Sequence, residues 1–137
     1  MAARILDGNA TGRQIREDLA PRVAAFQART GRAPGLGIVI VGNDPASQIY
    51  VRNKIKSGGE SQLFADLIEL PETTTLDELL AVVARLNASP LHDGILVQSP
   101  LPKAMGPTAE ITVFEAIDPA KDVDGFSPVN VGRLVQN

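Results

Sequence analysis

The sequence predicts an α/β protein: a three-layer βαβ domain in which helices flank a mainly parallel sheet. Residues 36–41 form an apolar run without polar alternation, which is typical of a strand buried on both faces. Two further strand candidates, residues 63–70 and 95–97, alternate with helical segments, as βαβ units require. Hydrophobic residues make up 44% of the chain but aromatic residues only 4%. The core must therefore consist mostly of aliphatic side chains.

The first helix is predicted over residues 11–30. Its apolar residues recur every three or four positions, at Ile15, Leu19, Val23 and Phe26. Pro21 interrupts this pattern and removes one backbone hydrogen bond, so we expect a kink or a break there. Gly31 ends the segment.

The second helix should begin after the first strand. Asp44 is a good N-cap with Pro45 at the first helical position, and Ser47 is the alternative cap. The helix should fail near Gly58 and Gly59, because each glycine costs ~1 kcal/mol in a helix interior.

The remaining helices follow the second and third strands. Thr75 and Glu78 form a capping box, which opens a helix whose apolar face comprises Leu79, Val82, Val83 and Leu86. Another helix is predicted near residues 108–117, and a short one should start at residues 127–128. The loop of residues 118–126 separates these last two helices.

The composition excludes several classes of protein. Apolar stretches reach only about seven residues, whereas a membrane span needs ~20, and no secretion signal is visible. The absence of cysteine excludes disulfides and thiolate chemistry and is typical of a cytoplasmic chain. A net charge of −3 argues against a nucleic-acid surface. We expect no metal site, and we expect the one histidine, His92, to face solvent.

Two unusual features follow strands, at the sheet edge where open α/β proteins bind ligands. Tyr50 and Lys54 lie four residues apart on the predicted second helix and so share a face. Gln98 follows the third strand together with Pro100 and Pro102, whose rings stiffen the segment into a wall suited to a pocket.

An acidic loop, residues 122–125, is the third unusual feature. Each of the three also has a simple structural interpretation: a solvated helix face, a capped strand end and a tight turn. The chain has neither a Gly-x-x-x-x-Gly-Lys nor a Gly-x-Gly-x-x-Gly motif, so nothing in it indicates a dinucleotide site.

Taken together and in order, these features resemble the methylenetetrahydrofolate dehydrogenase/methenyltetrahydrofolate cyclohydrolase family. The three family signatures are matched by residues 41–51 with Lys54 and Lys56, by residues 93–102, and by residues 119–126. Residues 5–8 and 130–134 fit as well, so the resemblance covers essentially the whole chain. The family usually has leucine where this chain has Ser99.

The resemblance implies an enzyme of one-carbon metabolism. Family members oxidise 5,10-methylenetetrahydrofolate to 5,10-methenyltetrahydrofolate with NADP, and then hydrolyse this product to 10-formyltetrahydrofolate. It also implies a cytoplasmic location, a link to purine and amino-acid biosynthesis, and a homodimer in the full-length family. We expect the lobe alone to be monomeric, with tetrahydrofolate derivatives as its ligands and with no nucleic-acid or membrane partner.

The resemblance assigns roles to four residues. Lys54 would be the central residue of the hydrolytic step, Tyr50 would stack on the folate, Gln98 would tune Lys54, and Asp124 would hold the pterin. The substrate-binding set it implies is Ser47, Tyr50, Val97, Pro100, Leu101, Pro102 and Asp124. These roles suit the residue types, because a buried lysine can relay protons and a carboxylate pairs with the N–H groups of a pterin.

The resemblance also predicts the domain organisation. Residues 1–126 would form the folate-binding catalytic domain, and residues 127–137 would start the helix that leads to an NADP-binding Rossmann domain, which follows in the family. We expect this chain to be one lobe expressed on its own rather than a truncated gene product. It should then hold no cofactor, transfer no hydride, and act at most as a cyclohydrolase.

The chain departs from the family at the end of the second helix. Gln62 stands where the family has glycine, and Gly58 and Gly59 should shorten or loosen the helix that carries Lys54. Two alternatives therefore remain open: a folate-binding module without catalysis, and an interaction lobe that only packs against another domain.

Overall fold

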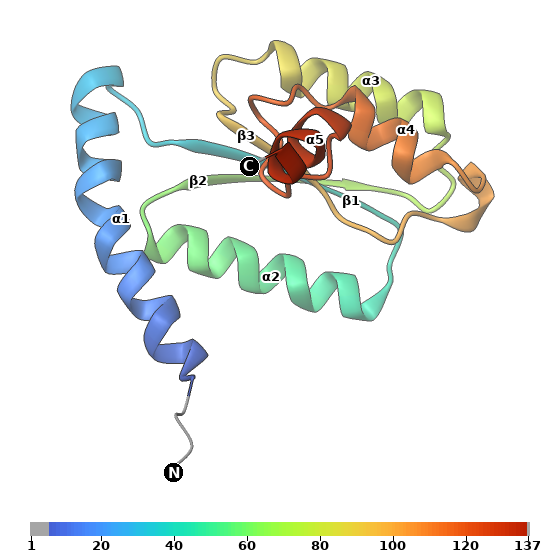
Figure 1. The fold of residues 1–137 in the computed structure, drawn as a ribbon. Helices are drawn as coiled ribbons and strands as arrows, with labels where there is room; N and C mark the ends of the chain where they lie inside the picture. The colour runs from blue at the N-terminus through green and yellow to red at the C-terminus, as the bar shows by residue number, and fades with distance from the viewer. Residues whose placement is uncertain (1–5, 137) are drawn as a thin grey trace.

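The computed structural model describes residues 6–136, so Ile5 of the opening motif and Asn137 lie outside the described residues. Helices and strands alternate along most of the chain (Figure 1). In order they are α1 (Gly8–Thr30), β1 (Gly35–Val41), α2 (Pro45–Glu60), β2 (Phe64–Leu70), α3 (Leu76–Ala88), β3 (Gly94–Val97), the 3₁₀ helix η1 (Lys103–Met105), α4 (Ala109–Ala116) and α5 (Pro128–Gln136). The predicted elements are all present, and only η1 was not expected.

The sheet has the strand order β2-β1-β3, and both pairs of strands are parallel. At the centre of the register, Val39 pairs with Ile68 on one side and with Val97 on the other. The outer edge of β3 is also paired, because the N–H of Ile95 donates to the carbonyl of Lys121 at 2.7 Å. This pairing holds the start of the predicted acidic loop against the sheet.

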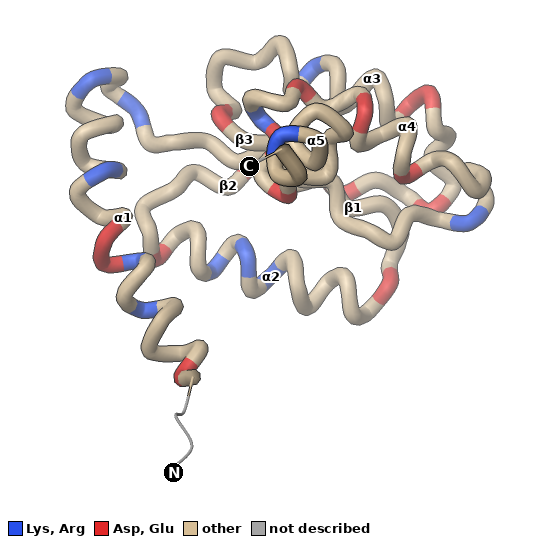
Figure 2. The backbone as a smooth tube through the Cα atoms, viewed as in Figure 1, with Lys and Arg blue, Asp and Glu red and all other residues tan. Residues whose placement is uncertain are grey.

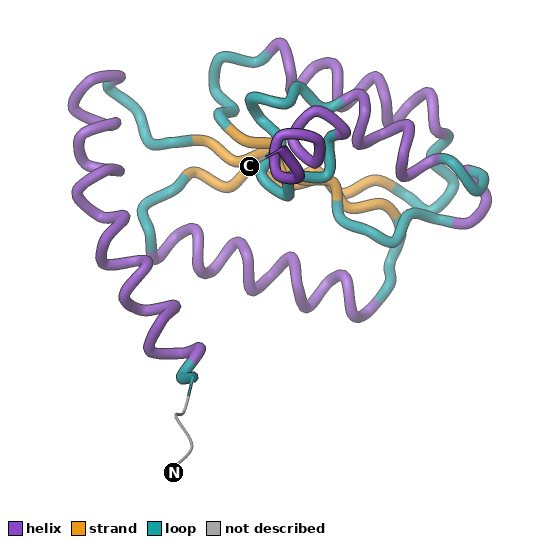
Figure 3. The backbone as a smooth tube through the Cα atoms, in the orientation of Figure 1, coloured by secondary structure: helices purple, strands orange, loops and turns teal. Residues whose placement is uncertain are grey.

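Apolar side chains fill both faces of the sheet and confirm the three-layer prediction. Helix α2 covers one face, and α3 and α4 cover the other (Figures 1 and 3). The buried cluster under α2 consists of Ile38, Ile40, Val51 and Leu96. The larger cluster under α3 and α4 consists of Val39, Val41, Leu79, Val83, Leu86, Ile95, Val97, Val113 and Ile117.

Helix α1 begins slightly earlier than predicted, because the side chain of Asp7 caps it. That carboxylate accepts hydrogen bonds from the N–H groups of Asn9 and Ala10, both at 3.0 Å. The helix continues through Pro21 without a break, and its axis changes direction about half-way along (Figure 1). The expected disturbance at the proline is therefore a bend, consistent with the loss of one internal hydrogen bond.

Helix α2 starts as predicted. Asp44 caps it by accepting a hydrogen bond from the N–H of Ser47 at 2.7 Å. The helix continues through Gly58 and Gly59 and ends immediately after them, at Glu60. The two glycines therefore mark its last turn but do not interrupt it.

The end of α2 is a Schellman turn. The N–H of Leu63 donates to the carbonyl of Gly58, and the N–H of Gln62 donates to that of Gly59. This geometry places Gln62 in the left-handed region, with φ of 59°. Glycine is the residue that normally occupies this position of a helix end.

The predicted capping box of α3 is present: the N–H of Glu78 donates to the Thr75 hydroxyl, and the N–H of Thr75 donates back to the Glu78 carboxylate. The expectation for His92 was wrong, because this side chain is buried. Its ring nitrogens lie 3.0 Å from Asp66 Oδ2 and 2.8 Å from the Ser89 hydroxyl. The polar turn around His92 indicated exposure, but a segment distant in the sequence packs against it. Among the described residues, no helix is both long and apolar enough to cross a bilayer.

Candidate active site

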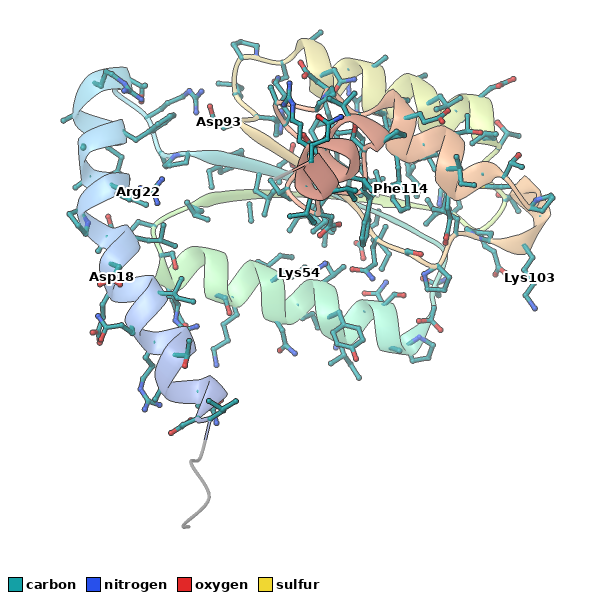
Figure 4. The ribbon with its side chains drawn as sticks, in the orientation of Figure 1. Asp18, Arg22, Lys54, Asp93, Lys103 and Phe114 are labelled. Atoms are coloured by element: carbon teal, nitrogen blue, oxygen red, sulfur yellow. The ribbon has the colours of Figure 1, made fainter. Side chains whose placement is uncertain are left out.

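Lys54 and Gln98 meet at the carboxyl end of the sheet. The ammonium of Lys54 donates a hydrogen bond to Gln98 Oε1 at 3.2 Å. Lys54 lies on α2 (Figure 4), and Gln98 directly follows β3, where its own N–H extends the ladder by donating to Val39 O. Both residues are half-buried. The solvated-face interpretation therefore holds for Tyr50, which is exposed, but not fully for Lys54, whose amine is bonded to Gln98.

The Gln98 amide has a defined orientation. Its Nε2 donates to the backbone carbonyl of Ser99 at 2.6 Å, which leaves Oε1 facing the Lys54 ammonium. An oxygen is the atom that an ammonium group requires as partner, since the ammonium has only donors. The pair therefore holds the amine at a fixed place without adding a second charge.

Asp124 is close enough to the Lys54 amine for the two charges to interact. Partial burial raises the pKa of Asp124 above its ordinary value, the positive charge of Lys54 opposes this rise, and the charge of Asp122 adds to it. A lysine charge that acts on this carboxyl places Asp124 and Lys54 within electrostatic range. The acidic loop thus brings a negative charge within range of the Lys54 amine on α2.

The loop that carries Asp124 is built around Asp122. The Asp122 carboxylate accepts hydrogen bonds from the N–H groups of Gly125 and Ser127 and from the side-chain amide of Asn130, at 2.8–3.0 Å. Burial alone would raise the pKa of Asp122, but these donors outweigh it and hold the pKa below its ordinary value. The tight-turn interpretation is thus correct for Asp122, which organises the turn, whereas Asp124 is exposed.

Tyr50 precedes Lys54 by one turn of α2 and is 61% exposed. Its side chain is therefore accessible to a flat ligand. Positive charge continues along this helix at Arg52 and Lys56, and Figure 2 shows basic positions in the middle of α2.

The proline-rich segment lines a separate, open cleft of about 400 Å³. Its walls are Val41, Gly42, Asn43, Asp44 and Glu72 on one side and Pro100, Leu101, Pro102 and Lys103 on the other. The lining does not include Lys54 or Gln98. The three predicted wall residues, Pro100, Leu101 and Pro102, therefore line a hollow that does not include the amine.

Two residues of the predicted substrate-binding set are buried. Ser47 is 4% exposed and is engaged with Asp44, and Val97 packs in the core cluster beneath α3 and α4. The side chain of Val97 therefore lies on the face of the sheet opposite to α2. Only its backbone lies near Gln98.

Sequence reasoning missed Glu110, on α4. Its Oε1 accepts hydrogen bonds from the Ser99 hydroxyl at 2.5 Å and from the N–H of Leu101 at 3.0 Å. A lone glutamate in a short helix gave no signal of this contact. Glu110, eleven positions from Ser99, thus holds the segment that follows Gln98 in place.

The start of α2 does not fit the pyrophosphate of a dinucleotide. A pyrophosphate needs free N–H groups at a helix N-terminus, but at the start of α2 the carboxylate of Asp44 already accepts from Ser47. Hydrogen bonds from the backbone and hydroxyl of Ser47 hold the pKa of Asp44 below its ordinary value, so the cap stays negatively charged. A phosphate would be repelled there.

The chain matches a family model over residues 6–124, namely that of the tetrahydrofolate dehydrogenase/cyclohydrolase catalytic domain. The chain belongs to the tetrahydrofolate dehydrogenase/cyclohydrolase family. The match covers the first two motif segments and residues 119–124 of the third. The recognition made from those motifs is thereby confirmed.

Curated relatives from the same family are bifunctional proteins named FolD. The protein from Solibacter usitatus is 52% identical over 134 residues, which cover 98% of this chain but 42% of that protein. The one from Chlorobium chlorochromatii is 49% identical over 131 residues, or 96% of this chain and 43% of that protein. The chain thus spans less than half the length of these relatives.

Solved structures of family members share the fold. The bifunctional FolD enzyme of Campylobacter jejuni superposes with a TM-score of 0.89 at 39% identity, over 97% of this chain and 46% of that one. The FolD of Trypanosoma brucei, solved with NADP cofactor and an inhibitor, gives a TM-score of 0.88 at 37% identity, over 98% and 45%. The family's use of NADP is therefore shown for that protein, and the α/β fold of this chain agrees with both.

Proposed function

We propose that this domain binds a tetrahydrofolate derivative and catalyses hydrolysis of 5,10-methenyltetrahydrofolate to 10-formyltetrahydrofolate. The observation that carries this proposal is the contact of Lys54 with Gln98, with the carboxylate of Asp124 in electrostatic range. In this reaction, water attacks a carbon of a cationic folate. A positioned amine, an uncharged amide and a carboxylate are groups that suit this step.

The proposed chemistry uses each group in turn. Water adds to the electron-poor methenyl carbon between N5 and N10, and the Lys54 ammonium donates a proton to N5 as the carbon–N5 bond breaks. Lys54 takes back one proton from the added water, which leaves the formyl group on N10 and releases the second water proton overall. Gln98 holds the amine through Oε1, and Tyr50 stacks on the folate ring.

Asp124 is proposed to bind the pterin. A pterin edge presents adjacent N–H donors, which match the two oxygens of a carboxylate. The raised pKa of Asp124 shows that its ionised form is only partly compensated in the free domain. Donors from a ligand would supply the missing compensation.

The sharpest test compares two lysine variants on one helix. Lys54→Met should reduce the loss of methenyltetrahydrofolate absorbance to the buffer rate, whereas Lys56→Met, which removes an exposed charge nearby, should keep most of the wild-type rate. If the folded wild-type domain itself hydrolyses no faster than buffer but binds a folate in a calorimetric titration, it is a binding module without catalysis. If it does neither, it is a packing lobe.

In the full-length protein, we propose that residues 1–126 form the folate-binding catalytic domain and that α5 begins the connection to an NADP-binding domain. Helix α5 buries none of its residues here, and it exposes Val129, Val131, Leu134 and Val135. Such a helix is available to pack against further chain. The oxidation of methylenetetrahydrofolate would belong to the two domains together.

The biological setting follows from the same proposal. It comprises a cytoplasmic enzyme of one-carbon metabolism that serves purine and amino-acid biosynthesis, and a homodimer in the full-length protein with a monomeric isolated domain. The absence of cysteine supports the proposed cytoplasmic location, because the cytoplasm is a reducing compartment. Gel filtration of the domain tests its oligomeric state.

A further inference from the structure

A short chain of hydrogen bonds leads from α4 to the proposed catalytic amine. Glu110 accepts from the Ser99 hydroxyl and from the N–H of Leu101. The carbonyl of Ser99 in turn accepts from Gln98 Nε2, and Gln98 Oε1 accepts from Lys54. Glu110 touches neither Gln98 nor Lys54, but it fixes the segment on which the orientation of Gln98 depends.

The orientation matters because a glutamine amide can turn over about its last side-chain torsion. That torsion has two broad and nearly equivalent positions. In one, Oε1 faces the ammonium; in the other, the NH₂ group would face it, and two donors would oppose each other. The bond from Nε2 to the carbonyl of Ser99 selects the first position only if that carbonyl is held still.

Glu110 is suited to hold it. One oxygen of its carboxylate accepts hydrogen bonds from two donors, the Ser99 hydroxyl and the N–H of Leu101. The bond from the Ser99 hydroxyl is short, as is typical of a charge-assisted bond. Glu110 is half-buried at the start of α4, so the carboxylate lies on a regular element rather than on a loop. The chain uses Ser99 here, the residue at which it departs from the family pattern.

We propose that Glu110 is a positioning residue for the hydrolysis, which acts through Ser99 to keep Gln98 Oε1 on the Lys54 amine. The inference rests on the proposed function for its catalytic consequence, but its structural part does not need turnover. Glu110→Leu should release the segment. Glu110→Gln keeps an oxygen that can accept both hydrogen bonds and should preserve it.

The structural arm of the test follows the side-chain NH₂ signals of Gln98 in ¹⁵N–¹H spectra, assigned by their loss in Gln98→Ala. In the wild type and in Glu110→Gln these signals should occupy one hydrogen-bonded position. In Glu110→Leu they should shift to the position of a solvated amide. Glu115→Leu, a matched loss of an exposed charge on the same helix, should not move them. Unmoved signals in Glu110→Leu would overturn the proposal.

The kinetic arm measures hydrolysis of methenyltetrahydrofolate by the same proteins. Glu110→Leu should lower kcat by ~10-fold with little change in KM, because misplacement of a catalytic group affects the step and not the binding. Glu110→Gln should restore the rate to within ~2-fold. Unchanged kcat in a variant whose Gln98 signals have shifted would overturn the catalytic role. A wild type without turnover defeats the proposed function instead, and the spectra alone then decide whether Glu110 orients Gln98.

Discussion

The ammonium of Lys121 lies 2.7 Å from the backbone carbonyl oxygen of Asn87, at the end of α3. It also donates to the carbonyls of Leu86 and Ser89, at 3.2 and 2.8 Å. A positive charge at a helix C-terminus satisfies carbonyls that have no partner within the helix. Since Lys121 immediately precedes the loop that carries Asp124, this contact fastens one wall of the site to the far side of the sheet.

Replacement of Lys121 by methionine should therefore destabilise the domain. The carbonyls of Asn87 and Ser89 would lose the Lys121 ammonium as donor, and that of Leu86 would keep only the N–H of Ser89, at a cost of about 1–3 kcal/mol in the free energy of unfolding. Urea unfolding measures this loss, with Lys103→Met, which removes an exposed charge, as the control. Equal stability of the two variants would contradict the anchoring role.

Gln62→Gly should stabilise the domain. Gln62 occupies a left-handed conformation at the end of α2 and is exposed, so glycine would relieve backbone strain without loss of packing. We expect a gain of up to about 1 kcal/mol in the free energy of unfolding. Gln62→Ala keeps the Cβ that causes the strain, and a gain of the same size in that variant would refute the explanation.

Replacement by alanine should have opposite effects on stability at two glycines. A Cβ at Gly59, inside α2, meets nothing within 4 Å, so Gly59→Ala should add up to ~1 kcal/mol of helix stability. A Cβ at Gly35 would lie 1.9 Å from the carbonyl oxygen of Leu91, which is backbone and cannot rotate away. Gly35→Ala should cost ~3 kcal/mol or more. Thermal unfolding of both variants checks this contrast.

Asp122 should make stability depend on pH in the acid range. Its pKa in the folded protein is below the ordinary value, so its contribution is fully present above pH ~4 and is lost as the pH falls through the folded pKa. Asp122→Asn should therefore be less stable than wild type at pH 7. The difference in the free energy of unfolding between the two proteins should be smaller at pH 3. A gap that is the same at both pH values would show that ionisation of Asp122 does not contribute.

Asp124 should behave in the opposite sense. Its raised pKa means that the ionised form destabilises the folded state at neutral pH, chiefly through partial burial. Asp124→Asn should thus slightly raise the thermal midpoint at pH 7 while it abolishes folate binding in calorimetry. A variant that binds as tightly as wild type would remove Asp124 from the proposed site.

Local signals in the sequence predicted the fold well. The apolar run at residues 36–41 became the central strand, and the Thr75–Glu78 capping box set the start of α3. These features depend on neighbours a few residues apart, which a sequence shows directly. The same holds for the cap at Asp44.

Contacts between distant segments could not be read from the sequence. His92 is buried because Asp66, twenty-six positions away, reaches it, and no periodicity indicates such a pair. Glu110 and Lys121 likewise act on segments far along the chain. Resemblance brought Lys54 and Gln98 together as a hypothesis, whereas the spacing of Tyr50 and Lys54 alone indicated only a shared helix face.

The order β2-β1-β3 has a consequence for assembly. The amine of Lys54 lies on α2, in the crossover from β1 to β2, and the amide of Gln98 that receives it directly follows β3, after the crossover from β2 to β3. A chain cut in the turn between β2 and α3 would yield two peptides, each with half of the constellation. If the two peptides associate spontaneously, the hydrogen bond between Lys54 and Gln98 should form again, and its presence would report the assembly.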